Sequence, residues 1–355
     1  MTWVKPKGHS KSRINWAGDV LINTESTEEE KILAIEILDN WRAIHSYPMH
    51  IFKKRLKEKS RLLDKNLLTV QRLKRVTAIL NKLKRTQTST MNLSQMQDIG
   101  GCRAVLSNVA LVRDLHEKYY LKENFKHKKM KTQDYISNPK NDGYRSLHLI
   151  YKYNTDRKGK KYYNGLLIEI QIRSRLQHLW ATAVETVGFF TRQAIKSNEG
   201  HPDWAEFFKL ISSAFAKMEN CPYVPDTPQD EKELYTKIKE KEKALKIIDK
   251  LKAWTNTMRL LDEKIKAKDK HKVEFFLLEL DIVGRKLGIL TYTKEQEQKA
   301  IDDYSALEKR HSGAKDYDVV LVGADTSKDL KKAYPNYFLD TGDFLIYLQK
   351  IINKY

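Results

Sequence analysis

Hydrophobic and polar residues alternate strictly over one segment in the middle of the chain. Aliphatic residues occupy every second position from Leu166 to Ile172, and polar residues alternate with them from Glu169 to Arg173. This period of two predicts a strand at 164–173 with one buried face. The other elements predicted here are strands at 103–107 and 146–154 and helices at 109–123 and 176–190. Strands interleaved with helices are typical of an α/β fold with a mixed sheet.

Toward the N-terminus, the pattern predicts two helices. Thr27 followed by two glutamates is a typical helix start, and apolar residues then recur through Trp41 with a helical period. The stripe of Leu73, Val76, Leu80 and Leu83 predicts a second, long helix at 67–85 with a basic opposite face. The first 24 residues are mixed in character and predict turns.

Three prolines in the segment 220–228 predict the end of one helix, and a charged helix is expected from 230 to 266. Beyond it, the pattern predicts strands at 272–280, 285–292 and 317–323 around a helix at 294–310, followed by two short helices. The sequence therefore indicates three parts, which are 1–229, a connecting helix at 230–267, and a small α+β domain at 268–355.

The composition of the 355 residues, 41% hydrophobic and 10% aromatic, is that of a globular protein with real cores. The net charge of +20 is unevenly distributed along the chain. The segment between His50 and Thr90 contains thirteen Lys or Arg but only two acidic residues. Such an excess indicates a polyanionic partner, although a solvated helix face would show the same pattern. Two separated cysteines exclude a disulfide framework and a Cys-x-x-Cys zinc site. We expect a cytoplasmic protein without a signal peptide or a membrane span.

Four short motifs follow one another over about a hundred residues. They are Arg-Leu-Lys at 72–74, Asp-Ile-Gly-Gly-Cys-Arg at 98–103, Gly-Tyr-Arg-Ser-Leu-His at 143–148 and Glu-Ile-Gln-Ile-Arg at 169–173. In this order they resemble the RelA/SpoT-type pyrophosphotransferases, and in particular their toxic small alarmone synthetase branch. Ala78 departs from the family, in which serine is usual. The resemblance implies a mixed-sheet RelA/SpoT nucleotidyltransferase core flanked by helices, with ATP as pyrophosphate donor and Mg²⁺ as cofactor.

Asp98 and Glu169 are the carboxylates that we expect on Mg²⁺, because hard cations prefer oxygen ligands and Mg²⁺ commonly uses one or two carboxylates. The resemblance also implies that Glu169 activates the acceptor hydroxyl. Asp98 could instead serve only as a turn or cap residue, and Glu169 as a surface strand residue.

The resemblance implies that Arg72 and Arg103 sandwich the adenine, a role that suits the stacking guanidinium group. Lys74, Lys82 and Arg85 would then contact the triphosphate. The alternative is that one or two of these cations only keep the helix soluble.

The acceptor is expected to meet Tyr144, His148, Gln171 and Arg173. Tyr144 either stacks on the acceptor base or fills a hydrophobic gap, and the family match favours stacking. A lone histidine is often structural, but the motif favours a contact from His148 to the acceptor. Many relatives carry Trp-Ala-x-x-Glu-His after the strand, whereas this chain has Trp-Ala-Thr-Ala-Val-Glu-Thr at 180–186. That departure argues against the usual guanosine nucleotide acceptor.

Four lysines, Lys126, Lys128, Lys129 and Lys131, precede the acceptor loop. A tRNA acceptor stem would use such cations through its phosphates, and the toxic branch of the family includes enzymes that pyrophosphorylate the 3′ end of tRNA. We therefore expect a tRNA-modifying toxin. One alternative is a (p)ppGpp or (p)ppApp synthetase. The other is a non-catalytic RNA-binding regulator, and the two intact carboxylates disfavour this second alternative.

The motif Tyr-Pro-Asn-Tyr, with Tyr334 and Tyr337, resembles the tyrosine motif of fused toxin-antitoxin synthetases of the CapRel type. The resemblance implies a C-terminal pseudo-zinc-finger-like domain that covers the ATP site and is released by a phage structural protein such as a major capsid protein. Both tyrosines could equally be core or turn residues.

We expect a monomer.

Overall fold

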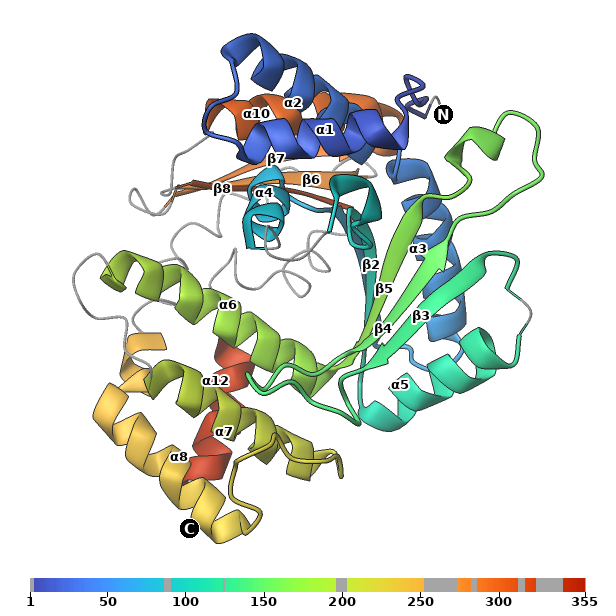
Figure 1. The fold of residues 1–355 in the computed structure, drawn as a ribbon. Helices are drawn as coiled ribbons and strands as arrows, with labels where there is room; N and C mark the ends of the chain where they lie inside the picture. The colour runs from blue at the N-terminus through green and yellow to red at the C-terminus, as the bar shows by residue number, and fades with distance from the viewer. Residues whose placement is uncertain are drawn as a thin grey trace.

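One mixed sheet of eight strands organises the part of the chain described by the computed structural model (Figure 1), which covers residues 3–85, 91–123, 125–195, 203–251, 273–281, 286–311, 317–323 and 341–354. The strand order is β3-β4-β5-β2-β1-β8-β6-β7. The strands are β1 Leu68–Leu73, β2 Gly100–Leu106, β3 Lys128–Asp134, β4 Leu147–Lys152, β5 Leu167–Ser174, β6 Val273–Asp281, β7 Lys286–Thr293 and β8 Tyr317–Gly323. Among them, β2 and β5 pair in parallel, and the other neighbours pair antiparallel.

The helices form three groups around this sheet (Figure 1). The main ones are α1 Lys11–Ile22, α2 Glu28–Ala43, α3 Ser46–Arg61, α4 Val76–Arg85, α5 Val109–His116, α6 Arg175–Ile195, α7 Asp203–Met218, α8 Glu231–Leu245, α10 Glu297–Arg310 and α12 Gly342–Ile352. A π-helical turn, Glu117–Leu121, extends α5. Helix α3 packs on the buried face of β2, β4 and β5 through Phe52 and Leu56. Helices α1, α2 and α4 share a second core, and α6, α7, α8 and α12 share a third.

Most elements predicted in the middle of the chain are confirmed. Strand β5 buries Ile168, Ile170 and Ile172 completely, as its alternation indicates. Helix α2 begins after Thr27, which accepts a hydrogen bond from the backbone of Glu30 in a capping box. The strands predicted at 103–107 and 146–154 and the helices predicted at 109–123 and 176–190 are also present.

The long helix predicted at 67–85 is wrong in its first half. Residues Leu68–Leu73 form strand β1, and α4 begins only at Val76. Every residue of β1 pairs with β2, and Gln71 and Arg72 also pair with β8. Pairing on both sides therefore outweighs the helical spacing of its leucines. The turns predicted for the first 24 residues are also wrong, because Ser10 caps helix α1.

The C-terminal strands continue the sheet of the preceding residues. Strand β8 pairs with β1, and α12 returns to α6, α7 and α8, where it buries Phe344 and Leu348. The functional boundary proposed at 268 stays a prediction, but the segment beyond it does not form a sheet of its own. Helix α8 ends at Leu245, where Lys246 adopts a left-handed conformation with φ of 49°. Its predicted extension beyond 251, like Tyr334 and Tyr337, lies outside the described residues. Within the described ranges, no helix combines the length and the apolar composition that a membrane crossing requires.

Candidate active site

Two cross-strand rows place six of the predicted site residues on one face of the sheet. The first row is Arg72, Gly101, Glu169, Ile150 and Lys131, from β1, β2, β5, β4 and β3. The second row, one pleat along, is Val70, Arg103, Gln171, His148 and Gln133. Residues paired across neighbouring strands point to the same face. We call this the catalytic face; the opposite face packs on α3.

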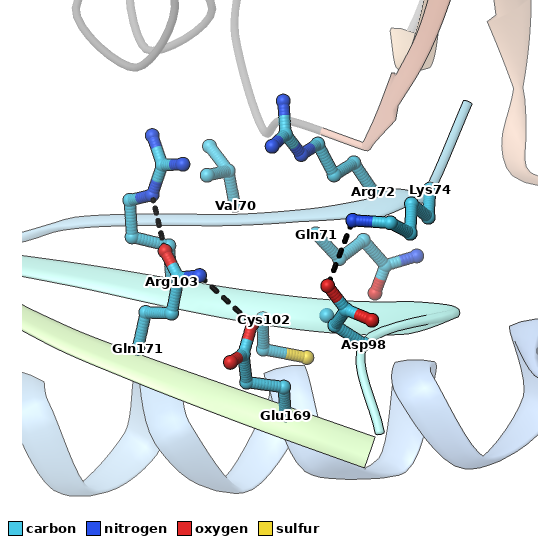
Figure 2. A pocket seen from close by; sticks show the side chains of 10 residues that line it. Val70, Gln71, Arg72, Lys74, Asp98, Cys102, Arg103, Glu169 and Gln171 are labelled. Carbon is cyan, nitrogen blue, oxygen red and sulfur yellow. Dashed lines mark hydrogen bonds and ion pairs between the residues drawn. The ribbon is translucent and has the colours of Figure 1, made fainter. Parts of the chain in front are cut away.

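A pocket of about 440 Å³, including its open mouth, lies over β1, β2 and β5 (Figure 2). Its lining includes Arg72, Lys74, Asp98, Arg103 and Glu169, and also four residues that the sequence did not single out, Val70, Gln71, Gly101 and Cys102. Gly101 contributes no side chain between Arg72 and Glu169 in the first row, so the floor of the pocket stays open there.

Arg72 and Arg103 extend from neighbouring strands to the same side of the sheet, with Val70 between them (Figure 2). The Nε of Arg103 donates to Gln171 Oε1 at 3.4 Å. Two guanidinium groups over an aliphatic side chain can accept a flat aromatic ring between them. The geometry is therefore compatible with the predicted adenine sandwich.

Asp98 lies just before β2 and holds two cations. Lys74 Nζ is 2.8 Å from Oδ2, and Lys82 Nζ, from α4, is 3.0 Å from Oδ1. Burial raises the pKa of Asp98, but the charges of Lys74 and Lys82 outweigh burial and hold that pKa below its ordinary value. Asp98 therefore stays ionised at neutral pH.

Glu169 is the most enclosed carboxylate of the pocket. Its Oε1 lies 2.9 Å from His148 Nδ1, and its Oε2 accepts a hydrogen bond of 2.8 Å from Gln171 Nε2. Burial and the charge of Asp98 raise the pKa of Glu169, whereas the contacts to His148 and Gln171 lower it, and the net shift is downward. A buried carboxylate kept ionised can accept a proton from a substrate hydroxyl.

Tyr144 connects to Glu169 through His148. Its hydroxyl lies 2.7 Å from His148 Nε2 and accepts a hydrogen bond of 2.7 Å from Arg173. Burial raises the pKa of Tyr144, but Arg173 and His148 outweigh it and lower the pKa to about 8. Tyr144, His148 and Glu169 thus form a continuous hydrogen-bonded chain that ends at the pocket. Stacking of Tyr144 on an acceptor base stays a prediction.

The loop before β4 is held in place by α7. Gly143 has a φ of +93°, and a Cβ there would lie 2.9 Å from Trp180 and 3.0 Å from Ser212. The buried guanidinium of Arg145 donates to Ser212 Oγ and to the carbonyl oxygens of Ile136 and Pro222. Sequence reasoning named Tyr144 but missed this anchoring role of its neighbours, because the partners are up to 77 residues away.

Residues 71–189 match the family model described as "Region found in RelA / SpoT proteins". This part of the chain is similar to that region, and residues 71–189 are called the RelA/SpoT region below. It contains the pocket-lining strands β2 and β5, the Tyr144 loop and both carboxylates.

Two curated proteins of Bacillus subtilis (strain 168) are similar to this region. The GTP pyrophosphokinase YjbM is 32% identical over 119 residues, which are 33% of this chain and 54% of YjbM. The GTP pyrophosphokinase YwaC is 32% identical over 117 residues, which are 32% of this chain and 54% of YwaC. The chain thus spans about half the length of the curated relatives that it matches.

A similar solved structure is that of small alarmone synthetase 1 from Bacillus subtilis, bound to its product pppGpp. It shares 23% sequence identity with a TM-score of 0.41, covering 50% of this chain and 90% of that protein.

Within the RelA/SpoT region, the structure separates the four lysines that were predicted to bind tRNA. Lys128 pairs with Lys152 and Lys131 with Ile150, so both project from the catalytic face of β3. Lys129 pairs with the buried Tyr151 and projects from the other face, and a bulge between Lys129 and Lys131 brings Lys131 back to the face of Lys128. Lys126 precedes the strand and lies 3.4 Å from Asp156. Two of the four lysines therefore share a face with Glu169.

Arg85 and Lys82 are predicted ATP contacts that do not line the pocket. Arg85 is exposed in the last turn of α4, where its Nε donates to the backbone of Asn81 at 3.2 Å. Lys82 nevertheless reaches Asp98.

The pocket offers two carboxylates for a divalent cation. Across the described residues, no site brings three His, Cys, Asp or Glu side chains together for a metal. Asp98 and Glu169 nevertheless fit Mg²⁺, because both are ionised oxygen donors and the charge of Asp98 opposes ionisation of Glu169. An ion there would take its remaining ligands from water and substrate phosphates, as Mg²⁺ commonly does.

Proposed function

We propose that this protein is an ATP-dependent pyrophosphotransferase. The observation that carries the proposal is the arrangement of Asp98 and Glu169 in one pocket with Arg72 and Arg103. Two ionised carboxylates beside a pair of guanidinium groups suit a reaction that moves charged phosphates. The names of the curated relatives, which match the same region, support this class of reaction.

Glu169 is the base in the proposed reaction. The acceptor hydroxyl gives its proton to Glu169, and its oxygen forms a bond to the β-phosphorus of ATP. The bond from that phosphorus to the oxygen of the α-phosphate breaks, so AMP leaves and two phosphates stay on the acceptor. Lys74 and Lys82 hold positive charge beside the phosphates. Mg²⁺ held by Asp98 and Glu169 would supply further positive charge at the phosphates.

We propose the 3′ end of tRNA as the acceptor. The basic face of β3 supports this choice, because Lys131 lies in the same cross-strand row as Glu169. Two strand spacings separate these residues, about 10 Å between the backbones. Lys128 and Lys152 extend the basic face along the strands. A polyanion whose end reaches Glu169 could contact these lysines through its phosphates.

A free guanosine nucleotide is the second candidate acceptor. It is favoured by the names of the two curated relatives, both called GTP pyrophosphokinases. Incubation of the protein with labelled ATP and, separately, tRNA, GDP, GTP and AMP distinguishes the candidates. We expect label on tRNA. Label on GDP or GTP with none on tRNA would contradict the tRNA proposal and leave the pyrophosphotransferase proposal intact.

The split of the lysines provides a matched control for tRNA binding. Replacing Lys128 and Lys131 by Ala should weaken tRNA modification and reduce the salt slope of tRNA binding by about one unit for each phosphate that is no longer neutralised. Replacing Lys126, which precedes the strand, and Lys129, which projects from the other face, removes the same charge and should have a smaller effect. Equal effects of the two double variants would indicate general charge attraction and would contradict a defined tRNA path.

We further propose that the protein is a fused toxin-antitoxin of the CapRel type, inhibited by its own C-terminal segment and released by a phage structural protein such as a major capsid protein. Support comes from β8, whose last residue, Gly323, pairs with Gln71 next to Arg72. The segment that contains Tyr334 and Tyr337 follows Gly323 in the sequence. A restraint within the same chain acts at high effective concentration, so weak contacts suffice.

Point substitutions test the autoinhibition more cleanly than truncation does. Deleting residues from 268 onward would also remove β8 from the edge of β1 and α12 from its core. Replacing Tyr334 and Tyr337 by Ala should make the full-length protein toxic to its host without a trigger, and adding Glu169→Gln should remove that toxicity. A harmless, folded double variant that is also no more active in vitro than the wild type would contradict autoinhibition by these tyrosines.

A further inference from the structure

Glu308 contacts the corner between β1 and α4. It lies on α10, which belongs to the C-terminal part of the chain. Its Oε1 accepts a hydrogen bond of 2.9 Å from the backbone N–H of Val76, the first residue of α4. Its Oε2 lies 2.8 Å from a guanidinium nitrogen of Arg42 on α2. The side chain of Glu308 is 10% exposed and that of Arg42 is 3% exposed. This is a buried, charged contact from outside the RelA/SpoT region.

The corner that Glu308 contacts, which we call the donor corner and define as residues 74–76, is tied to the pocket. Arg42 Nε donates to the carbonyl oxygen of Lys74 at 3.0 Å, so Glu308 and Arg42 together hold both ends of the corner. The backbone N–H of Lys74 donates to Ile99 at 2.8 Å. From this corner, Lys74 Nζ reaches Asp98, and α4 delivers Lys82 to the same carboxylate.

The contact has strong physical reasons to fix the position of α4. The first N–H groups of a helix lack partners within the helix, and a carboxylate at a helix N-terminus interacts favourably with its dipole. Removing one member of a buried ion pair leaves the other charge uncompensated. Arg42 has two further neighbours, Asp39 at 3.6 Å and the ring of Tyr304 at 4.9 Å. The hydrogen bond from the N–H of Val76 goes to Glu308.

We propose that Glu308 is a positioning residue for the ATP side of the pocket. It fixes the donor corner and the start of α4, so that Lys74 and Lys82 are presented to Asp98 and to the phosphates of ATP. The inference rests on the proposed function. On this proposal the C-terminal segment supports ATP binding, and this role is separate from inhibition. The segment is then needed for full ATP affinity.

The test compares Glu308→Gln with Asp302→Asn in the full chain. Asp302 lies on the same helix but is exposed and hydrogen-bonded to Gln298. The measurements are the Kd of a non-hydrolysable ATP analogue by calorimetry and the KM of the acceptor. In Glu308→Gln we expect the analogue to bind about tenfold more weakly, as loss of one charge-assisted hydrogen bond implies, with the KM of the acceptor unchanged. Asp302→Asn should match the wild type.

Several outcomes would overturn the inference or the proposed function separately. Unchanged analogue affinity in a folded Glu308→Gln variant overturns the inference, and so does equal weakening of the analogue and the acceptor, which indicates a general loss of structure. If Glu308→Gln does not fold, Glu308→Asp takes its place in the test. The aspartate keeps the negative charge near Arg42, but its side chain is one methylene too short to reach Val76. Unchanged analogue affinity in Glu308→Asp overturns the inference. A wild-type protein that does not bind the analogue refutes the proposed function instead.

Discussion

Replacing His148 by Phe should shift the acidic limb of the pH profile. The ring keeps its volume, but Glu169 loses the hydrogen bond of 2.9 Å from Nδ1. Burial of Glu169 then dominates, and burial raises the pKa of a carboxyl. A hydrogen bond to a charged group contributes about 1.5–3 kcal/mol, so its loss should raise the pKa of Glu169 and lower the ionised fraction about ten- to hundredfold at the acidic end of the profile.

The sign follows from the proposed role of Glu169 as a base. Only the ionised carboxylate accepts the proton of the acceptor, so activity is lost as the pH falls through the pKa of Glu169. Raising that pKa moves the loss of activity to higher pH. The assay is kcat/KM for the acceptor measured across the acidic range, because this ratio reports the ionisation of the free enzyme.

Tyr135→Phe is the matched control. The ring of Tyr135 contacts that of His148 edge-on, with centroids 5.3 Å apart, but the structure shows no hydrogen bond from its hydroxyl to Glu169; it accepts one from Gln133 instead. The control should leave the acidic limb in place. An unshifted acidic limb in His148→Phe, or a shift to lower pH, would show that His148 does not keep Glu169 ionised.

Three further predictions concern stability and the acceptor loop. Burial and the charge of Glu274 raise the pKa of Glu297 from 4.5 to about 8. The unfolded chain therefore loses this proton at lower pH than the folded protein, and stability should fall as pH rises from 4.5 to 8. Glu297→Gln should flatten this decline in thermal melts. On α12, Phe344→Ala should lower the free energy of unfolding by about 3–5 kcal/mol in denaturant titrations, whereas the exposed Ile346→Ala should change it by less than about 0.5 kcal/mol; equal effects would contradict the packing of α12. Gly143→Ala should raise the KM of the acceptor more than that of ATP, because a Cβ there meets Trp180.

The sequence predicted strand β5 well because one of its faces is buried and the other lies in the pocket, which leaves a clear period of two. Strand β1 gave no such signal, since five of its six residues are buried. The spacing of Leu73, Val76, Leu80 and Leu83 runs across the junction of β1 and α4 and imitates one helix. The partners that make residues 68–73 a strand lie elsewhere in the chain, as far away as β8, and local patterns do not reveal them.

The motifs indicated which residues lie together, whereas their roles in catalysis stay predictions. Asp98, Arg103 and Glu169 converge on one pocket as the motifs implied. The division of the basic segment could not be predicted, because it depends on the bulge after Lys129. The contact of Glu308 with Val76 could not be predicted either, since 232 residues separate them in the sequence.

The most direct test of the central claim follows the β-phosphate of ATP. With ATP labelled at the β-phosphorus and tRNA or a guanosine nucleotide as acceptor, we expect label on the acceptor, release of AMP in equal amount, and loss of both products in Glu169→Gln. Label that stays in ADP would indicate transfer of a single phosphate, and label in free pyrophosphate would indicate hydrolysis. Either result would contradict pyrophosphate transfer by this protein.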